Sequence, residues 1–465
     1  MTMKNCSRFF KLLWAFFFVE MGVVLFLSIS RHFSVDELES IQASWKIFSG
    51  HRIYADFYEH HHPFFYYMLA LVIGIFKEGV IAIIASRLLV FLMILLIFAV
   101  TYNISKKLFG KEPAVISLIL LSTTNVFVFT AIELRPDVPQ VLFGLISISL
   151  LLSFFQSNKL KHLVLSSISL GVSFLFLQKS IFLGLIIGVL LLLGACSRQI
   201  KFKDAVSYLL VFLATLMPYY GYLILSGQLP IYWIYNWTMN VALFNCLSSR
   251  GDGAIITLLS SFKDAPLLWI FWLISMLFLD TSNQIRAGAV SLFLLIIFIL
   301  VQCPFKYYLM LVLPLIAMMA GHAMCQLINV VFKRKSLLIC LIAVIYIFYV
   351  PNLYLNITKN HPDNSKQLKK MEYVLLITKQ KDLVYGGEGY FILFRENVDR
   401  FWSGQEALVW LNNKASYYRF NVYEMIDRSR PKVILNNDML DMKDYRIANN
   451  YRRSDKYPDL YVRIN

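Results

Sequence analysis

Residues 80–102 read VIAIIASRLLVFLMILLIFAVTY, an apolar run interrupted by one charge, Arg87. A helix needs roughly 20 such residues to cross the hydrocarbon core of a bilayer, so this run is long enough to span it. The whole chain has the same character, because 58% of its 465 residues are hydrophobic, 15% are charged and the mean hydropathy is +0.62. These values exclude a soluble globular enzyme and predict an all-α polytopic membrane protein.

Basic residues outnumber acidic residues by 44 to 28, which gives a net charge of +16. A charge of this size suits nucleic acid only if it lies on one face, but the lysines and arginines gather in short clusters between apolar runs. Cytoplasmic loops of membrane proteins carry such clusters, so we expect no nucleic-acid partner and place the clusters inside. The clusters are Lys106/Lys107/Lys111, Lys159/Lys161, Arg198/Lys201/Lys203, Arg286 and Lys333/Arg334/Lys335.

The apolar runs between these clusters predict about eleven membrane spans, with the N-terminus inside. The first run, residues 9–30, follows Lys4, Arg8 and Lys11 and is too long for a signal-peptide core, so we expect an uncleaved first span. Residues 63–76 form a run of about 14 residues, a length typical of an interfacial or re-entrant segment. On this topology the chain returns outside near residues 135–137, 178–179, 226–264 and 302–306.

The composition changes near residue 358, which predicts two domains. Residues 1–357 are expected to form the membrane-embedded domain, with residues 31–79 as its first outer loop. In residues 358–465 Asn, Tyr and Gly replace the Leu, Ile and Phe runs, so we expect a small extracytoplasmic α/β domain. Its predicted elements are a helix over residues 363–378 and strands over residues 383–385, 432–435 and 460–464.

Acidic residues are concentrated in the first outer loop. Ser34-x-x-Glu37 fits a capping box, and apolar residues from Val35 to Phe48 repeat at helical intervals, which predicts an amphipathic helix on the membrane surface. Asp36 would lie in the first turn, where the helix dipole favours the ionised carboxylate. The acidic residues of this loop are Asp36, Glu37, Glu39, Asp56 and Glu59.

An ionised carboxylate at this position has several uses. Asp36 can take a proton from an incoming hydroxyl, hold a cationic acceptor or bind a metal ion, and it can also be a solvated charge at a helix start. Glu37, at the third helical position, can simply cap its own helix.

Three further outer turns carry charges that topology does not require. Residues 133–139 contain two acids, Arg135 and two prolines, which predicts a rigid polar turn. Lys179 and Lys306 each stand alone in a short outer turn, where they can bind a lipid phosphate or extend toward the headgroups.

The run His60-His61-His62 suggests a metal site. In an extended segment His60 and His62 point to the same side, so these two could bind a divalent metal ion together with Asp36 or Asp56. The alternative is an interfacial turn in which the histidines form hydrogen bonds with the backbone or with headgroups.

Several of these motifs together resemble the superfamily of dolichyl-phosphate-mannose protein mannosyltransferases and aminoarabinose transferases, the GT-C glycosyltransferases. The resemblance covers most of the chain and depends on the order and spacing of short motifs. The motifs are Asp36-Glu37, Gly50-x-x-x-Tyr54-x-Asp56-Phe57-Tyr58-Glu59-His60, His62-Pro63-Phe64-Phe65-Tyr66-Tyr67, Arg135-Pro136-Asp137, Phe176-Leu177-Gln178-Lys179-Ser180 and Lys306-Tyr307-Tyr308 before Pro314.

This resemblance implies transfer of a sugar from a polyprenyl-phosphate donor to an extracytoplasmic acceptor, with inversion at the anomeric carbon. Asp36 matches the family's first-loop catalytic aspartate, and Asp137 matches its second-loop aspartate, with Glu37 as a further catalytic candidate. The candidates for substrate binding are Arg135, Lys179, Lys306, Tyr307, Asp56 and Glu59. The acceptor class stays open between a glycolipid, a polysaccharide and a protein, and we expect a bacterial inner membrane with the site facing the periplasm.

Two other functions are compatible with a basic, many-spanning chain. A lipid-linked glycan transporter or flippase usually places ionisable groups near the bilayer midplane, whereas the acids here crowd the outer loops. A glycan polymerase or ligase that uses a lipid-diphosphate donor would also act at this face. The acidic first loop and the soluble tail favour the lipid-monophosphate class.

Overall fold

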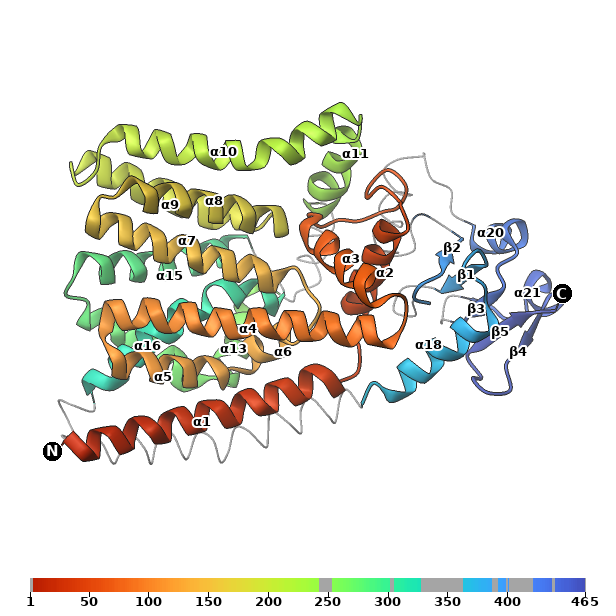
Figure 1. The fold of residues 1–465 in the computed structure, drawn as a ribbon, viewed down its shortest axis with the longest axis horizontal. Helices are drawn as coiled ribbons and strands as arrows, with labels where there is room; N and C mark the ends of the chain where they lie inside the picture. The colour runs from red at the N-terminus through yellow and green to blue at the C-terminus, as the bar shows by residue number, and fades with distance from the viewer. Residues whose placement is uncertain are drawn as a thin grey trace.

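The computed structural model describes residues 3–241, 253–301, 305–327, 363–386, 392–398, 400, 421–436 and 440–464, with side chains from residue 11 onward. Long helices lie side by side in a bundle, and the N-terminus lies at the end far from the C-terminus (Figure 1). The bundle helices are α1 (Met3–Ser30), α4 (Val80–Phe109), α5 (Lys111–Ser122), α6 (Asn125–Ala131), α7 (Asp137–Ser157), α8 (Leu160–Phe176), α9 (Ser180–Cys196), α10 (Phe202–Leu225), α13 (Ala254–Asp264), α14 (Pro266–Ser275), α15 (Ser282–Leu300) and α16 (Leu313–Leu327).

Shorter helices complete the membrane part of the chain. α2 (Val35–Phe48), α3 (Phe64–Phe76) and α11 (Leu229–Trp233) lie at the end of the bundle nearest the C-terminus (Figure 1). One turn of π-helix, η1 (Ile234–Thr238), follows α11, and the 3₁₀ segments are η2 (Met276–Phe278) and η3 (Lys306–Leu311).

The apolar helices make the chain an integral membrane protein. Within the described residues α1 from Lys11, α4, α7, α10 and α15 are long and apolar enough to cross a membrane, and two bent pairs raise this number to seven. The pairs are α5 with α6, bent by 71°, and α13 with α14–η2, bent by 102°. The shorter helices α8, α9 and α16 coincide with other expected spans, but the last expected span lies outside the described residues, so the count of eleven stays a prediction.

The first outer loop forms α2 where the capping box predicts a helix. The expected position of this helix on the membrane surface is wrong, because Ile41 and Trp45 are buried inside the protein. α2 packs against α3 on one side, and on another side Gln42 binds the tail, donating to the carbonyl of Arg395 at 2.7 Å and accepting from the amide of Phe394 at 2.9 Å. The tail therefore covers a surface that the sequence pattern assigned to lipid.

The tail forms the expected small α/β unit. Its five strands are β1 (Leu383–Gly386), β2 (Glu396–Asn397), β3 (Val433–Leu435), β4 (Tyr451–Arg453) and β5 (Leu460–Arg463), in the order β2-β1-β3-β5-β4. β1 pairs in parallel with β2 and β3, whereas β5 pairs antiparallel with β3 and β4. The helices are α18 (Ser365–Ile377), α20 (Val422–Ser429) and α21 (Tyr445–Ala448), and the expected boundary at residues 357–358 lies outside the described residues.

Alternate residues of the strands face two separate apolar clusters, as the pleat of a strand requires. Val384 and Val433 pack with Val374 of α18 on one face. Tyr385 and Ile434 pack on the other face with residues of α20 and α21. α18 therefore lies between the sheet and the outer end of the bundle, where it meets the segment between α1 and α2 (Figure 1).

Candidate functional site

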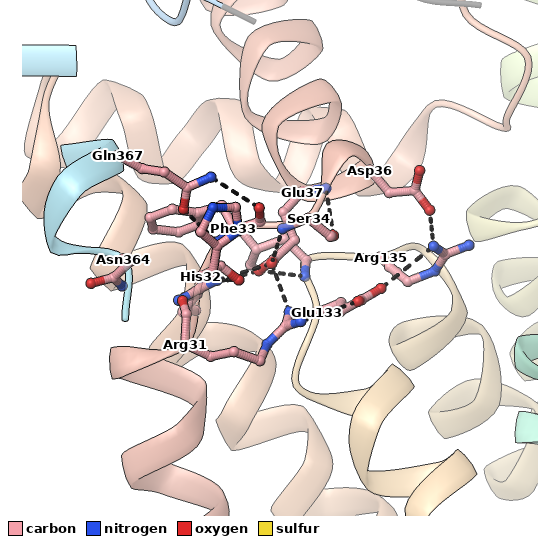
Figure 2. Close-up of polar contacts among 12 residues, drawn as sticks. Arg31, His32, Phe33, Ser34, Asp36, Glu37, Glu133, Arg135, Asn364 and Gln367 are labelled. Carbon is pink, nitrogen blue, oxygen red and sulfur yellow. Dashed lines mark hydrogen bonds and ion pairs between the residues drawn. The ribbon is translucent and has the colours of Figure 1, made fainter. Parts of the chain in front are cut away.

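Asp36 lies in the first turn of α2, and its side chain is 49% exposed. The predicted capping box is confirmed: the amide of Ser34 donates to Oε2 of Glu37 at 3.0 Å, and the amide of Glu37 donates to Oγ of Ser34 at 3.4 Å. The carboxylate of Asp36 is directed away from this cap and forms an ion pair with Arg135 (Figure 2). The first turn of α2 thus carries Asp36 with a half-exposed carboxylate and Glu37 with a carboxylate that caps the helix.

Glu37 belongs to a fully buried set of charges. Its Oε2 accepts from Arg31 at 2.7 Å and from Arg87 at 2.9 Å, and its side chain has no exposed area. Burial alone would raise the pKa of the Glu37 carboxyl, but the charges of Arg87 and Arg31 outweigh burial and hold it below its usual value. This geometry favours capping and anchoring as the role of Glu37 over a role in chemistry.

Glu133 links this buried set to the exposed carboxylate. Its Oε1 lies 3.4 Å from Nη1 of Arg31, and its Oε2 lies 3.5 Å from Nη1 of Arg135. Burial raises the pKa of the Glu133 carboxyl to about 8, against the lowering effect of Arg31. We call Arg31, Glu37, Arg87 and Glu133 the buried charge cluster.

Two cations and a second carboxylate meet beside Asp36. Nε of Arg135 lies 3.2 Å from Oδ2 of Asp137 at the start of α7, and Lys179 at the start of α9 pairs with the other oxygen of Asp137. The ring of Tyr307 lies under both cations, with its centroid 4.0 Å from the Arg135 guanidinium and 4.7 Å from Nζ of Lys179. We call Asp36, Arg135, Asp137, Lys179 and Tyr307 the outer charge cluster.

A cavity opens next to Lys179. Gln140 and Tyr308 contribute its other polar groups, and the remaining wall is apolar. The apolar lining comes from α9, α15 and the residues around η3: Phe182, Leu294, Ile297, Phe298, Val301, Leu311 and Val312. A cation at the end of an apolar cavity among membrane helices suits a lipid whose headgroup is anionic.

Comparison with known proteins gives one family match and several similar folds. Residues 60–222 match the family described as dolichyl-phosphate-mannose-protein mannosyltransferase, and no curated protein matches the chain. The structure resembles ArnT from Cupriavidus metallidurans, solved bound to undecaprenyl phosphate, over 67% of this chain and 60% of that one, at 18% identity and a TM-score of 0.52.

The fold of an archaeal enzyme is similar over almost the whole chain. The oligosaccharyltransferase of Archaeoglobus fulgidus in its apo form matches over 93% of this chain and 71% of that one, with 13% identity and a TM-score of 0.56. AglB from the same organism, in complex with an inhibitory peptide and a dolichol-phosphate, matches over 96% and 74%, with 12% identity and a TM-score of 0.54. The chain has the fold of the GT-C glycosyltransferases. It spans 60% of the length of ArnT.

Three of the residues expected to bind substrate, Lys306, Asp56 and Glu59, do not take part in the outer charge cluster. Lys306 is 49% exposed and pairs with Asp264 at 3.5 Å. Asp56 pairs with Arg52 at 3.3 Å, four positions earlier in the same loop. The structure therefore brings together five of the expected residues, Asp36, Arg135, Asp137, Lys179 and Tyr307, and places Lys306 and Asp56 in local ion pairs.

The histidine run has a different geometry from the expected one. His62 is buried, with Nδ1 2.5 Å from the carbonyl oxygen of Phe174 and Nε2 2.9 Å from the hydroxyl of Tyr232, and burial lowers its pKa to about 3. Both ring nitrogens of His62 therefore already have hydrogen-bond partners. His62 cannot bind a metal ion together with His60, as the sequence predicted, without giving up one of them. The reason is a bend at His61, which breaks the alternation of an extended strand.

Glu59, His60 and His61 converge instead. Their ligand atoms lie within 4.8 Å of one another, and Oε1 of Glu59 is 3.1 Å from Nδ1 of His61. Burial would raise the pKa of Glu59, but the hydrogen bond from His61 and the charges of both histidines outweigh it and lower the pKa. Oε2 of Glu59 and Nδ1 of His60 are buried without a hydrogen-bond partner in the part of the chain that the structure describes.

The sequence did not point to Arg31 as a member of the site, and it showed Arg87 only as a charge within an apolar run. Both residues bind Glu37, and the signal for them is weak but present, since each arginine lies at or inside the end of an apolar helix. An arginine buried at the end of a membrane helix needs a carboxylate partner. The first outer loop is rich in carboxylates, so it is the part of the chain in which to look for that partner.

Proposed function

We propose that the chain is a glycosyltransferase that moves a sugar from a polyprenyl-phosphate donor to an acceptor at the outer face of the membrane, with inversion at the anomeric carbon. One observation carries the proposal: Arg135 and Lys179 lie together beside a half-exposed carboxylate, Asp36, at the end of an apolar cavity among membrane helices. Undecaprenyl phosphate is bound to the similar ArnT and dolichol-phosphate to the similar AglB, which supports a lipid phosphate as the ligand of this end of the cavity.

The donor binds by exchange of ion-pair partners. Arg135 and Lys179 are neutralised by Asp36 and Asp137 before the donor arrives, and a phosphate offers oxygens that a guanidinium can bind in bidentate fashion. Tyr307 keeps both cations in place by its ring face without competing as an anion. The polyprenyl chain extends along the apolar wall formed by α9, α15 and the residues after η3.

The transfer step then needs one base and a stabilised leaving group. The acceptor hydroxyl oxygen forms a bond to the anomeric carbon while the bond from that carbon to the phosphate oxygen breaks, and the electron pair of the broken bond stays on the phosphate. The hydroxyl proton passes to Asp36, which is freed when Arg135 turns to the phosphate. Arg135 and Lys179 stabilise the additional negative charge of the departing polyprenyl phosphate.

The acceptor is a glycolipid, a polysaccharide or a protein, and the site faces the periplasm of a bacterial inner membrane. The half-exposed Asp36 supports an acceptor that approaches from the aqueous side. The apolar lining of the cavity supports the donor as the membrane-bound substrate.

We also propose a divalent metal site at Glu59, His60 and His61. Two imidazoles and one carboxylate make a donor set that suits Zn²⁺, and the unpartnered Oε2 of Glu59 and Nδ1 of His60 fit a ligand at this point. Metal analysis of the purified chain tests this site. We expect about one zinc per chain, and loss of it in His60→Ala and in His61→Ala, while His51→Ala, which removes another histidine of the loop, keeps it. A wild-type chain without zinc, dialysed against micromolar zinc, contradicts the site.

The test of the main proposal is transfer of labelled sugar from a panel of polyprenyl-phosphate sugars to membrane extracts. Wild type is compared with Asp36→Asn and with Asp204→Asn, which changes a first-turn aspartate of α10 at the other end of the bundle. We expect transfer by wild type and by Asp204→Asn, and none by Asp36→Asn. Binding or flipping of the lipid without transfer by any of the three proteins would favour the transporter.

A further inference from the structure

The C-terminal domain holds the segment that leads to Asp36. Gln367 of α18 binds both backbone groups of Phe33: its Oε1 accepts from the amide at 2.7 Å, and its Nε2 donates to the carbonyl at 3.1 Å. Asn364, which precedes α18, donates through Nδ2 to the carbonyl of Ile29 at 2.7 Å and through its amide to the carbonyl of Ser30 at 3.0 Å. Figure 2 shows Gln367 and Asn364 beside residues 31–34.

Arg87 of α4 holds the same segment by other contacts. Its Nη1 donates to the carbonyl of Arg31 at 2.7 Å, and its guanidinium lies 3.8 Å from the centroid of the Phe33 ring. The connection between α1 and α2 is therefore fixed by a helix of the membrane part and by a helix of the tail.

The position of Asp36 depends on this connection. Half of the Asp36 side chain is exposed, so packing does not fix the carboxylate, and its location follows from where the backbone of α2 begins. Ser34 caps the helix and directly follows Phe33, so a shift of the Phe33 peptide shifts the cap and the first turn with it. In a catalytic site a misplacement of about 1 Å can reduce the rate on the order of 100-fold.

We propose that Gln367 is a positioning residue that sets the place of Asp36 from the C-terminal domain, an inference that rests on the proposed function. A two-point contact from one amide holds the peptide groups on both sides of Phe33, in orientation as well as in place, which apolar packing alone does not. The tail thus takes part in the reaction through the backbone of residues 33–36, without touching the substrate.

The variants Gln367→Met and Gln367→Glu test this role in the full-length chain. Gln367→Met keeps the length of the side chain and loses both hydrogen bonds, whereas Gln367→Glu keeps the acceptor for the Phe33 amide and loses the donor. Gln380→Met is the matched control, because Gln380 also joins the tail to the membrane part, through Glu78 at 3.1 Å, but does not bind residues 29–34.

Two readouts are measured: kcat and KM for the donor, and hydrogen exchange of the amides of residues 31–38. For Gln367→Met we expect kcat to fall about tenfold with KM within about twofold, and exchange at Phe33 to rise at least about fivefold. For Gln367→Glu, both kcat and the exchange rate at Phe33 should lie between the values of Gln367→Met and wild type. Gln380→Met should stay within about twofold of wild type in both readouts.

Each other outcome overturns the positioning role. Faster exchange with unchanged kcat would show that the clamp holds Phe33 without placing Asp36, and unchanged exchange would show that no clamp exists. A rise in KM alone would assign Gln367 to binding. Failure of the wild type to transfer any sugar overturns the proposed function instead, and the exchange readout still decides whether Gln367 holds the segment.

Discussion

Asp36 and Glu37 are neighbours in the sequence, yet they belong to two charge clusters with opposite properties. The outer charge cluster is reached by solvent at Asp36 and lies next to an apolar cavity, whereas Glu37 and Arg87 in the buried charge cluster have no exposed side-chain area. Carboxylates paired with arginines therefore have different roles in the two clusters, because solvent reaches Asp36 and does not reach Glu37. Exposed ion pairs can exchange partners with a ligand, but buried pairs are held because separation would leave a charge without water.

The largest effect should come from Asp36→Asn. The amide cannot accept the proton of the acceptor hydroxyl, so we expect kcat to fall by a factor of about 10² to 10⁴. The thermal midpoint should change by about 1 °C or less, because Asp36 is half exposed and Arg135 keeps its pairs with Glu133 and Asp137. Steady-state kinetics and thermal unfolding in detergent measure the two quantities. Substantial activity in this variant removes Asp36 from the chemistry.

The neighbouring change, Glu37→Gln, should act on folding instead. It leaves Arg87 buried without its carboxylate partner and Arg31 with Glu133 alone, which should lower the free energy of unfolding by about 3–5 kcal/mol. Thermal unfolding of the purified chain measures the loss. The double variant Glu37→Gln/Arg87→Met should recover part of it, since it removes a stranded charge. A stable but inactive Glu37→Gln would erase the distinction between the two clusters.

Lys179→Ala should weaken donor binding. Its ammonium lies at the cavity and contacts the rings of Tyr307 and Tyr308, so we expect KM for the donor to rise about 10- to 30-fold, with a smaller change for the acceptor. The comparison is Lys306→Ala, which the sequence pattern also places at the donor but which pairs with Asp264. An equal effect of both variants would show that the donor phosphate extends to Lys306.

The smallest effect concerns pH and Glu133. Its pKa is raised on folding from 4.5 to about 8 by burial, so the folded chain binds more protons and its stability should fall as the pH rises between these values. Glu133→Gln mimics the protonated form, and we expect it to flatten this fall, with a gain of about 1–2 kcal/mol at pH 9 and little change at pH 4. Thermal midpoints across this range test it, and a parallel pH dependence of variant and wild type contradicts it.

Much of the fold could be predicted from the sequence, because the signals are local. The capping box at Ser34 gives the start of α2, apolar runs give the long helices, and alternation gives β1, β3 and β5. The environment of α2 could not be predicted in this way. Its buried face is completed by Phe394 and Arg395, more than 350 positions later, and no local pattern records such a contact.

The site was predictable to a similar degree. The outer turns placed Asp36, Arg135, Asp137 and Lys179 at the same face of the membrane, and the structure brings them into contact. The sequence does not show in which direction a lysine side chain of an outer turn points. We therefore expected Lys306 beside Arg135 and Lys179, whereas it pairs with Asp264. The histidine run departs from the prediction for a related reason. A bend in the backbone directs His61, in place of His62, toward His60 and Glu59.

The pair of Arg87 with Glu37 bears on how the chain enters the membrane. Arg87 lies within α4, and an arginine that reaches the hydrocarbon without a partner resists insertion. Glu37 precedes it by 50 residues, so its carboxylate has already been synthesised when α4 leaves the ribosome. The order of synthesis thus supplies a carboxylate for Arg87 before α4 itself is complete.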